Sequence, residues 1–209
     1  MVGVDELLAT DPAVDAVALT FDDAFVNFAT VAWPLLRDHG LPATLCVVTD
    51  RTGTDNRWSG SQPGIPDLPL LDWTAIGQLV EDGVTVASHT RSHRRLTELD
   101  SMSVEDELGG SAERIEAELG TRPRGLAYPY GSVDDRTASV AAQTYHWACT
   151  TELRPLRAEE PPCLLPRLDM YYLRDRGRLE QWDSGVFWKR IWLRASARRL
   201  RQKLELWGT

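Results

Sequence analysis

Apolar and polar stretches alternate regularly along the chain and divide it into strand-like and helix-like segments. Short apolar runs rich in Val, Leu and Ala predict six buried strands, at residues 16–20, 43–49, 84–87, 125–128, 146–150 and 164–170. Apolar residues at helical spacing predict helices between the first strands, over residues 25–39, 73–82 and 103–119, and a shorter one through Val140. This alternation is typical of β/α units around a parallel sheet. We expect an α/β fold, a small or incomplete barrel in one domain.

Local signals refine the predicted helices. Pro34 falls inside the first helical pattern and predicts a kink or an early break. Ser103 and Asp106 form a partial capping box, which places the start of the third helix at Ser103. The pair Gly109-Gly110 weakens the middle of that helix.

Two adjacent carboxylates, Asp22 and Asp23, end the first predicted strand. Burying both without compensation would cost several kcal/mol, so they are exposed, paired or bound to a cation. The carboxyl ends of strands are where α/β proteins usually build their sites. A helix N-cap is the alternative, because Asp is favoured there and a helical pattern follows at once.

A second polar cluster, Ser88 to His93, follows the strand at 84–87. On a helical turn, the spacing of His89 and His93 puts both rings on one side, where they can share a cation. An unrelated surface pair is the alternative for this spacing alone. Because the ends of parallel strands meet at one edge, we expect these rings to approach Asp22 and Asp23.

Two imidazoles and one carboxylate leave positions open for water and substrate, which is the form of a catalytic metal site. The second carboxylate can then act as a general base toward the water. The residues therefore predict a metal-assisted hydrolase.

Three motifs in this order resemble those of the polysaccharide deacetylases, the NodB-like family four of carbohydrate esterases. They are Thr20-Phe21-Asp22-Asp23, Ser88-His89-Thr90-Arg91-Ser92-His93 and Ala127-Tyr128-Pro129-Tyr130-Gly131. The similarity runs from about Val17 to Met170. The family fold is a distorted barrel of roughly seven β/α units, so the resemblance implies a (β/α)7-type barrel over residues 1–180.

The resemblance also implies roles for individual residues. Asp22 matches the general base, and Asp23, His89 and His93 match the ligands of a divalent metal, zinc first, with cobalt, nickel or manganese as alternatives. The backbone N–H of Tyr130 matches the donor to the oxyanion. Its neighbours Pro129 and Gly131 are expected in the substrate site.

Two positions depart from the family pattern. The third motif commonly opens with an Arg that orients the base, and Ala127 stands here. Arg167, late in the chain, is our candidate replacement, with a surface ion pair as the alternative. The family's late general-acid His is also missing, since the last histidine is His146. We expect His146 and His39 to be structural, and Asp22 to return its proton to the leaving amine.

The segment from Arg51 to Pro69 lacks periodicity and carries Trp58. Loops of this length inside a compact domain are often functional rims or lids. Trp58 is a candidate sugar-stacking residue, and the alternative is that its ring packs against the protein without a ligand.

Charge and cysteine content narrow the class of protein. The net charge of −8 argues against general nucleic-acid binding. Three cysteines without metal-ligand spacing predict no disulfide framework. The acidic first fifteen residues contain no continuous apolar run, so we predict no signal peptide and expect a cytoplasmic protein.

The last residues, 181–209, form a basic and aromatic tail. Residues 186–209 carry seven cations and one Glu, a charge of +6, which leaves −14 for the remainder. Phe187, Ile191 and Ala195 share one helical face, and Arg194, Arg198 and Arg201 share another. We expect a terminal helix packed on the acidic barrel, with peripheral contact to an anionic membrane through residues 186–209 as the alternative.

Together these features predict a metal-dependent deacetylase that removes N-acetyl, or O-acetyl, groups from a glycan or an acetylated sugar compound. Hydrolysis of another amide, such as a cyclic imide or ureide, is a second hypothesis. A non-catalytic sugar-binding protein is the third.

Overall fold

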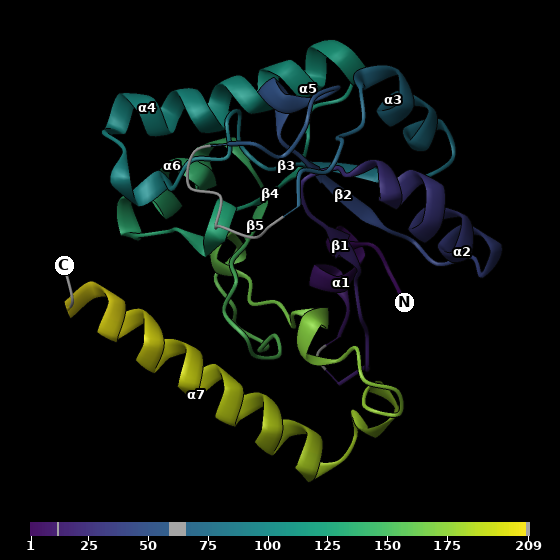
Figure 1. Cartoon of the computed structure of the whole chain (residues 1–209), viewed down its shortest axis with the longest axis vertical. Helices are drawn as coiled ribbons and strands as arrows, with labels where there is room; N and C mark the ends of the chain where they lie inside the picture. The colour runs from purple at the N-terminus through teal and green to yellow at the C-terminus, as the bar shows by residue number, and fades with distance from the viewer. Residues whose placement is uncertain (12, 59–65, 208–209) are drawn as a thin grey trace.

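A parallel sheet forms the centre of the protein (Figure 1). Within the described residues its strands are β1 (Thr20–Phe21), β2 (Thr44–Val47), β3 (Thr85–Ser88), β4 (Gly125–Ala127) and β5 (Trp147–Cys149), side by side in chain order. Thr44 pairs with Thr20 on one side and with Thr85 on the other. Every pairing is parallel. All the carboxyl ends therefore reach one edge of the sheet.

The computed structural model describes residues 1–11, 13–58 and 66–207, and their side chains except those of residues 199 and 201–207. The predicted loop at 51–69 is therefore described only in part. The side chain of Arg201, which we expected on the basic face of the tail, lies outside the described residues.

Side chains alternate between the two faces of the sheet, as strand geometry requires. On β2, Leu45 and Val47 pack in a cluster beneath the outer helices, whereas Cys46 belongs to a different cluster on the inner face. The inner cluster also contains the small residues Ala87 and Ala127, together with Trp147. β2, β4 and β5 are buried on both faces, which explains their continuous apolar sequences.

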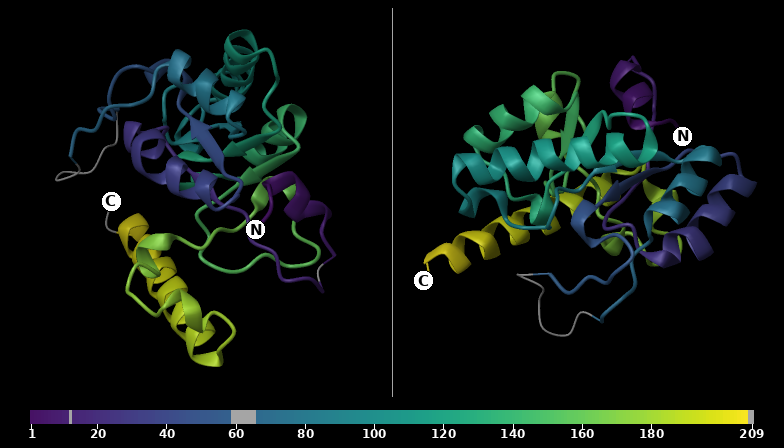
Figure 2. Two further views of the ribbon diagram at one scale, coloured as in Figure 1. Left: turned by 90° about the vertical axis from the view of Figure 1, so that its right-hand side faces the viewer. Right: turned by 90° about the horizontal axis from the view of Figure 1, so that it is seen from above.

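Helices cover the outer face of the sheet (Figures 1 and 2). They are α2 (Trp33–Asp38), α3 (Trp73–Glu81), α4 (Ser101–Glu105), α5 (Ser111–Leu119) and α6 (Asp135–Thr144). The short α1 (Val4–Ala9) near the N-terminus instead packs Val4 into the inner cluster. An aspartate accepts a backbone N–H at the start of three of them, Asp72 for α3, Asp100 for α4 and Asp134 for α6. These N-caps define where the outer helices begin.

The structure refines two helical predictions. The first helical stretch is a π-helical turn at Phe28–Ala32 that continues into α2 with helical dihedrals at Ala32 and Trp33, so the chain does not break at Pro34, and the irregular π segment lies directly before this proline. The third stretch begins at Ser101, because Asp100 and not Ser103 is its N-cap. A π-helical segment at Asp106–Gly110 interrupts it where the two glycines weaken the pattern.

The last predicted strand, at 164–170, does not form as a strand. Leu165 makes an isolated parallel bridge to Cys149, and two backbone hydrogen bonds flank it. The described residues thus form a five-stranded, half-barrel sheet with one further point of pairing. This arrangement is consistent with the predicted distorted barrel, and the α/β fold class is confirmed.

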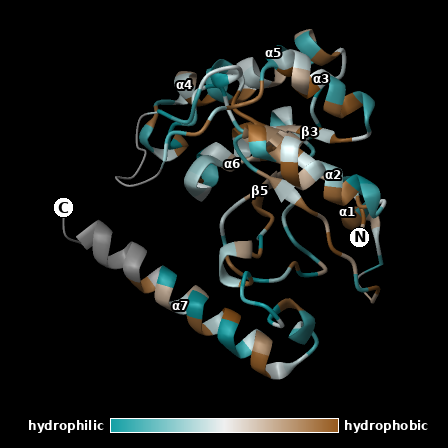
Figure 3. Cartoon of the chain, turned by 45° about the vertical axis from the view of Figure 1, so that its right-hand side comes forward, coloured by the Kyte–Doolittle hydropathy of each residue, from teal (hydrophilic) through white to brown (hydrophobic). Residues whose placement is uncertain are grey.

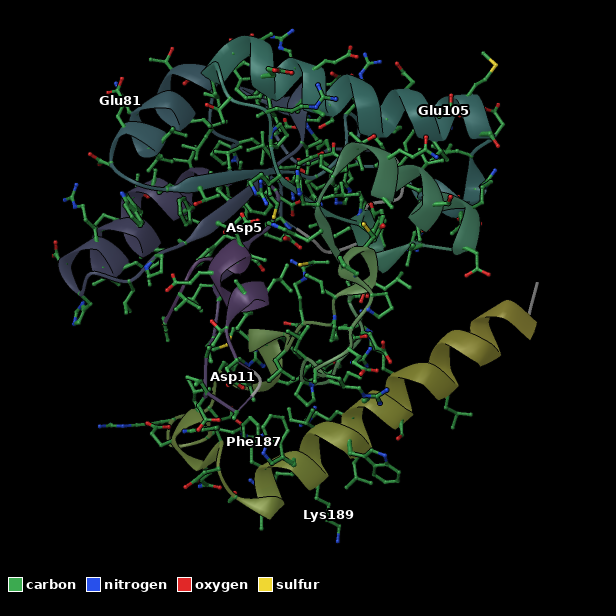
Figure 4. The ribbon with its side chains drawn as sticks, turned by 180° about the vertical axis from the view of Figure 1, so that it is seen from behind. Asp5, Asp11, Glu81, Glu105, Phe187 and Lys189 are labelled. Atoms are coloured by element: carbon green, nitrogen blue, oxygen red, sulfur yellow. The ribbon has the colours of Figure 1, made fainter. Side chains whose placement is uncertain are left out.

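Helix α7 (Gly185–Trp207) lies apart from the layer of sheet and helices (Figure 2). Phe187, Ile191 and Ala195 are buried on one side of it and pack against Leu153 and Leu173. In Figure 4, Phe187 points toward this packed segment and Lys189 points away from it. Hydrophobic and hydrophilic residues alternate along the coloured part of α7 (Figure 3). The division of the chain near residue 180 stays a prediction.

Candidate metal centre at the carboxyl edge of the sheet

Asp22 and Asp23 follow β1 directly and do not cap a helix. The next helical segment starts at Phe28, and its N-cap Asn27 makes no side-chain capping bond. Asp23 has a φ of 74° and Ala24 a φ of 59°, a left-handed turn that non-glycine residues rarely adopt. This turn separates the two neighbouring carboxylates into different surroundings.

Asp23, His89 and His93 come together as one group. The Nε2 atoms of His89 and His93 each lie 3.4 Å from Oδ1 of Asp23, and all three ligand atoms lie within 4.8 Å of one another. His89 donates its Nδ1 hydrogen to the carbonyl of Ala127 at 2.6 Å. That bond leaves the lone pair of Nε2 directed at the shared centre, which is the orientation a metal-bound histidine needs.

The polar atoms of this group fit a divalent cation. Oδ1 of Asp23 and Nδ1 of His93 are buried, and no described group forms a hydrogen bond with either atom. Burial, and after it the charge of the nearby His89, lower the pKa of His93 to about 2, so this imidazole is neutral. Burial lowers the pKa of His89, but the charges of Asp22 and Asp23 outweigh it and raise this pKa above its ordinary value, so a cation would displace a proton there. A carboxylate oxygen and two imidazole nitrogens are ligands that zinc accepts.

Asp22 is held by Arg167 instead of by the histidines. Nη1 and Nη2 of Arg167 donate to the two carboxylate oxygens of Asp22 at 2.7 and 2.8 Å, a bidentate pair. Burial raises the pKa of Asp22, but the charge and hydrogen bonds of Arg167 outweigh it and hold this pKa well below its usual range. Arg167 also donates to the Thr150 carbonyl and the Thr20 hydroxyl, which fixes the guanidinium.

The contact between Arg167 and Asp22 takes the place of the contact that the family's Arg at position 127 would make. At the position of the missing Arg, Ala127 contributes its carbonyl to His89 instead of a side chain to Asp22. Arg167 reaches Asp22 from the segment that pairs with β5 at Leu165, which is the contact expected from the sequence. Its role in catalysis stays a prediction.

The segment from His89 to His93 is a loop and not the helical turn that the spacing suggested. Thr90 and His93 have φ values of 66° and 62°, and these left-handed residues bring the two rings together. The backbone N–H groups of Thr49 and Asp50 donate to the carbonyls of Thr90 and Arg91, and these bonds attach the loop to the segment that follows β2. The rings share a site because of tertiary contacts, not because of helical periodicity.

Glu107 supports this loop and was not recognised in the sequence. Its buried carboxylate accepts the backbone N–H groups of Arg91 and Ser92 at 3.0 and 2.9 Å, and also the hydroxyl of Ser92. Next to it, Gly110 makes room for Arg91, since a Cβ there would lie 2.8 Å from Cδ of that side chain. The only available signal was an acidic residue beside Leu108 in a pattern of core-facing apolar positions.

The segment Pro129–Gly131 forms the third part of the site as a 3₁₀ turn after β4. Tyr130 has a φ of 59°, and its ring lies edge-on to His93 at 4.7 Å between centroids. Gly131 has a φ of 68°, and a Cβ there would lie 2.1 Å from Oγ1 of Thr151. Only glycine fits at residue 131, so its identity is explained by packing, while its predicted contact with substrate stays a prediction.

Trp58 packs onto the metal group. Its ring lies 4.1 Å from that of His93, centroid to centroid, at an interplanar angle of 36°. His93 is thus enclosed between the rings of Trp58 and Tyr130. The structure places Trp58 at the site and shows protein packing for part of its ring, and sugar stacking by this residue stays a prediction.

The two remaining histidines lie outside the site. Nδ1 of His39 is 2.8 Å from the carbonyl of Leu35, a contact at the end of α2. His146 is exposed, with Nδ1 3.4 Å from Arg124. Neither histidine replaces the missing general acid.

Comparison with known proteins assigns the family. The family model described as polysaccharide deacetylase matches residues 9–146, which include all three motifs. The chain belongs to the polysaccharide deacetylase family.

Individual relatives agree with the family assignment. The chain is 39% identical over 132 residues to chitin deacetylase 1 of Cryptococcus neoformans, an alignment that covers 63% of this chain and 24% of that protein. The deacetylase PplD of Streptococcus pyogenes, solved with acetate, has a similar structure with a TM-score of 0.69 and 25% identity, over 80% of this chain and 72% of that one. BC0361, a polysaccharide deacetylase of Bacillus cereus, gives a TM-score of 0.60 and 26% identity, over 72% of this chain and 46% of that one.

The chain spans 46% and 24% of the lengths of the two curated relatives it matches. The family and the fold are thus shown for this chain. The reaction and the substrate are inferred below from the site.

Proposed function

We propose that this protein is a metal-dependent hydrolase that removes N-acetyl groups from an acetylated carbohydrate. The convergence of Asp23, His89 and His93 beside the Asp22–Arg167 pair carries the proposal. A pure binding module needs no ionised carboxylate next to a set of metal ligands, whereas hydrolysis of an amide needs both. Membership of the polysaccharide deacetylase family supports the same reaction class.

Asp23, His89 and His93 would hold the cation, and zinc matches this donor set best. When bound there, a divalent cation polarises an acetyl carbonyl and lowers the pKa of a water molecule. The Ala127 carbonyl holds His89 in the tautomer that leaves Nε2 available. The chain therefore supplies an oriented ligand set before any cation binds.

Asp22 is the general base in this proposal. Arg167 keeps its carboxylate ionised at neutral pH and fixes both oxygens, so that it is ready to accept a proton from the attacking water. The backbone N–H of Tyr130 donates to the acetyl oxygen as negative charge develops on it. When the carbon–nitrogen bond breaks, Asp22 returns its proton to the departing nitrogen, and the products are a free amine and acetate.

The first test measures metal content and acetate release together on the purified protein. The substrates are acetylated monosaccharides and chito-oligomers, and the variants are His93→Ala and Asp22→Asn, with His146→Ala as a matched control outside the site. We expect near-stoichiometric zinc and acetate release in the wild type and in His146→Ala. His93→Ala should lose both, and Asp22→Asn should keep the metal while its turnover falls about 100-fold or more.

Other outcomes identify the competing functions. Normal turnover by Asp22→Asn would overturn both roles given to that residue. Bound metal with hydrolysis of small cyclic imides, and none of acetylated sugars, would replace deacetylation with imide hydrolysis. Bound metal with sugar binding but no hydrolysis of either class would identify a binding protein on this fold.

The basic tail, residues 181–209, raises the question of membrane contact and of the compartment in which the protein acts. No helix within the described residues is long and apolar enough to cross a membrane. The apolar face of α7 that we expected to dock is buried against Leu153 and Leu173. Peripheral membrane contact and a cytoplasmic location both stay predictions, and we propose the cytoplasm as the compartment for the first search.

A further inference from the structure

Arg95 places a positive charge next to the metal centre. Its guanidinium carbon lies 4.3 Å from the centre of the Tyr130 ring. Tyr130 in turn meets the ring of His93, one of the proposed ligands, at 4.7 Å. Arg95 is therefore separated from the ligand group by a single aromatic ring, and it follows His93 by only two residues.

The guanidinium of Arg95 is free to bind a ligand. Its side chain is 42% exposed, and its carboxylate contact within the described residues is from Nε to Glu98 at 4.0 Å, where Glu98 is 71% exposed. A contact this long between exposed groups contributes little. Arg91 in the same loop differs, because Asp50 and Asp106 engage its guanidinium at 3.2 and 2.6 Å.

The charge of Arg95 acts on the site itself. Burial raises the pKa of Tyr130, and the charge of Arg95 opposes that shift. The same charge adds to the lowering of the His93 pKa, after burial and His89. The charge of Asp22 is already met by the bidentate contact with Arg167, whereas no carboxylate comes closer to the guanidinium of Arg95 than the 4.0 Å contact with Glu98 within the described residues.

We propose that Arg95 is a specificity-determining residue that binds an anionic group, a carboxylate or a phosphate, on the acetylated carbohydrate. A guanidinium presents paired N–H donors that match both groups, and its place behind Tyr130 puts the anion close to the acetyl group that is removed. This inference rests on the proposed deacetylation and adds to it the chemical class of the substrate.

A purely structural role for Arg95 makes a different prediction. The cation–π contact could simply hold the ring of Tyr130 in place. In that case, removal of Arg95 would affect neutral and anionic substrates alike. The two roles are separated by comparing substrates that differ only in charge.

The experiment uses an oligosaccharide of N-acetylglucosamine and glucuronic acid and its methyl ester, which has the same skeleton without the charge. Acetate release gives kcat and KM, and calorimetry with the same two compounds gives binding without turnover. N-acetylglucosamine 6-phosphate against N-acetylglucosamine forms the phosphate arm. The variants are Arg95→Gln and Arg95→Lys, with Arg94→Gln as the matched control, because Arg94 is its exposed neighbour in the same loop.

We expect the wild type to favour the charged member of at least one pair by about 10- to 100-fold in kcat/KM, mainly through KM, as for a charged hydrogen-bonded pair. The arm in which this preference occurs identifies the carboxylate or the phosphate. Arg95→Gln should lose the preference, because kcat/KM falls far more on the charged compound than on the neutral one. Arg95→Lys should retain part of the preference, and Arg94→Gln should retain all of it.

An equal effect of Arg95→Gln on charged and neutral compounds, or no preference in the wild type, would overturn the inference and leave deacetylation standing. Absence of acetate release from every compound would overturn the proposed function instead. The calorimetric preference, and its loss in Arg95→Gln, would still decide whether Arg95 binds anions.

Discussion

Helix α7 and the loops at the carboxyl edge of the sheet differ in regular structure and in burial. The loops contain little regular structure, yet His89, Thr90 and His93 are 5% exposed or less. Helix α7 is 23 residues of regular structure, yet Trp192 is 62% exposed and Leu193 is 50% exposed. Regular secondary structure and burial are therefore separate properties in this molecule.

The site loops and helix α7 also differ in backbone strain. Within the described residues, every non-glycine residue with a positive φ lies in the site loops: Asp23, Ala24, Thr90, His93 and Tyr130. Each such residue costs about 1–2 kcal/mol, so the surrounding hydrogen bonds must offset it. Helix α7 carries no such strain among its described residues and needs only its own hydrogen bonds and one apolar face. The strain is concentrated where ligand atoms must converge.

Removal of the Glu107 carboxylate should have the largest effect on this contrast. Glu107→Ala leaves the backbone N–H groups of Arg91 and Ser92 without their acceptor, so we expect a loss of about 3 kcal/mol in the free energy of unfolding. Zinc affinity should fall about 10- to 100-fold, because the loop carries both histidine ligands. Urea unfolding and zinc titration measure the two effects.

Glu105→Ala is the control for this prediction, because Glu105 is an exposed neighbour (Figure 4). It should change the free energy of unfolding by less than about 0.5 kcal/mol. Equal effects of the two variants would mean that the loop is not held by Glu107.

Substitution of Gly131 should have the next largest effect. Gly131→Ala combines a positive φ with a clash against the Oγ1, Cβ and backbone N of Thr151, so we expect a loss of about 2–3 kcal/mol and reduced acetate release as Tyr130 moves. Gly40→Ala has the same sign of φ but open space around it, and should cost about 1 kcal/mol. Thermal unfolding of both variants gives the two losses in the free energy of unfolding, and their difference measures the clash with Thr151. Equal losses would show that packing at Gly131 contributes nothing.

A smaller and local effect is expected in α7. Ile191→Ala removes apolar contact with the cluster around Leu153 and Leu173, worth about 2 kcal/mol at this position. Hydrogen exchange of the amides in 185–207 should speed up, while acetate release stays at the wild-type rate. Leu193→Ala, on an exposed position of the same helix, should change neither quantity. A loss of activity in Ile191→Ala would show that the two regions are coupled.

The smallest effect concerns the segment that joins the two regions. Arg154 donates to both oxygens of Glu160 at 2.6 Å, and these hydrogen bonds lower the pKa of Glu160. A lowered pKa in the folded state stabilises the protein above the unfolded value of about 4.3, and this contribution is lost as the pH falls through the folded pKa. We expect about 1 kcal/mol.

Comparison of wild type with Glu160→Gln between pH 7 and pH 3 tests the pair. The difference in the free energy of unfolding should be largest at pH 7 and shrink toward pH 3. A difference that does not depend on pH would show that the carboxylate charge of Glu160 contributes nothing.

Local sequence patterns predicted much of the fold and of the site. The apolar runs located β2 to β5, whereas the run at 16–20 was wrong by several residues, because β1 begins only at Thr20 and its residues are half-buried. The polar residues after β1 and β3 were expected at one edge because parallel strands end there. The pairing of Asp22 with Arg167 was also expected, since Ala127 left the carboxylate without its usual partner.

Other features could not be read from local patterns. The stretch at 164–170 is apolar enough for a strand, but only Leu165 reaches a partner. The start of the third helix depended on Asp100, because the capping aspartate competes successfully with the Ser103 pattern. In the sequence, Glu107 resembles any other acidic residue of a helix. Its role follows only from its hydrogen bonds to the loop at Arg91 and Ser92.

By itself, the sequence predicted which residues form the candidate site and that the two acidic and two histidine side chains would meet at one edge of a parallel sheet. Periodicity and motif order suffice for this, because they act over a few residues and repeat. Only the tertiary structure decided how the ligand atoms are aimed: the left-handed turns at Asp23 and His93, the Ala127 carbonyl on His89, and the Glu107 carboxylate beneath the loop. These contacts join segments far apart in the chain, and their energies depend on geometry that no local pattern encodes.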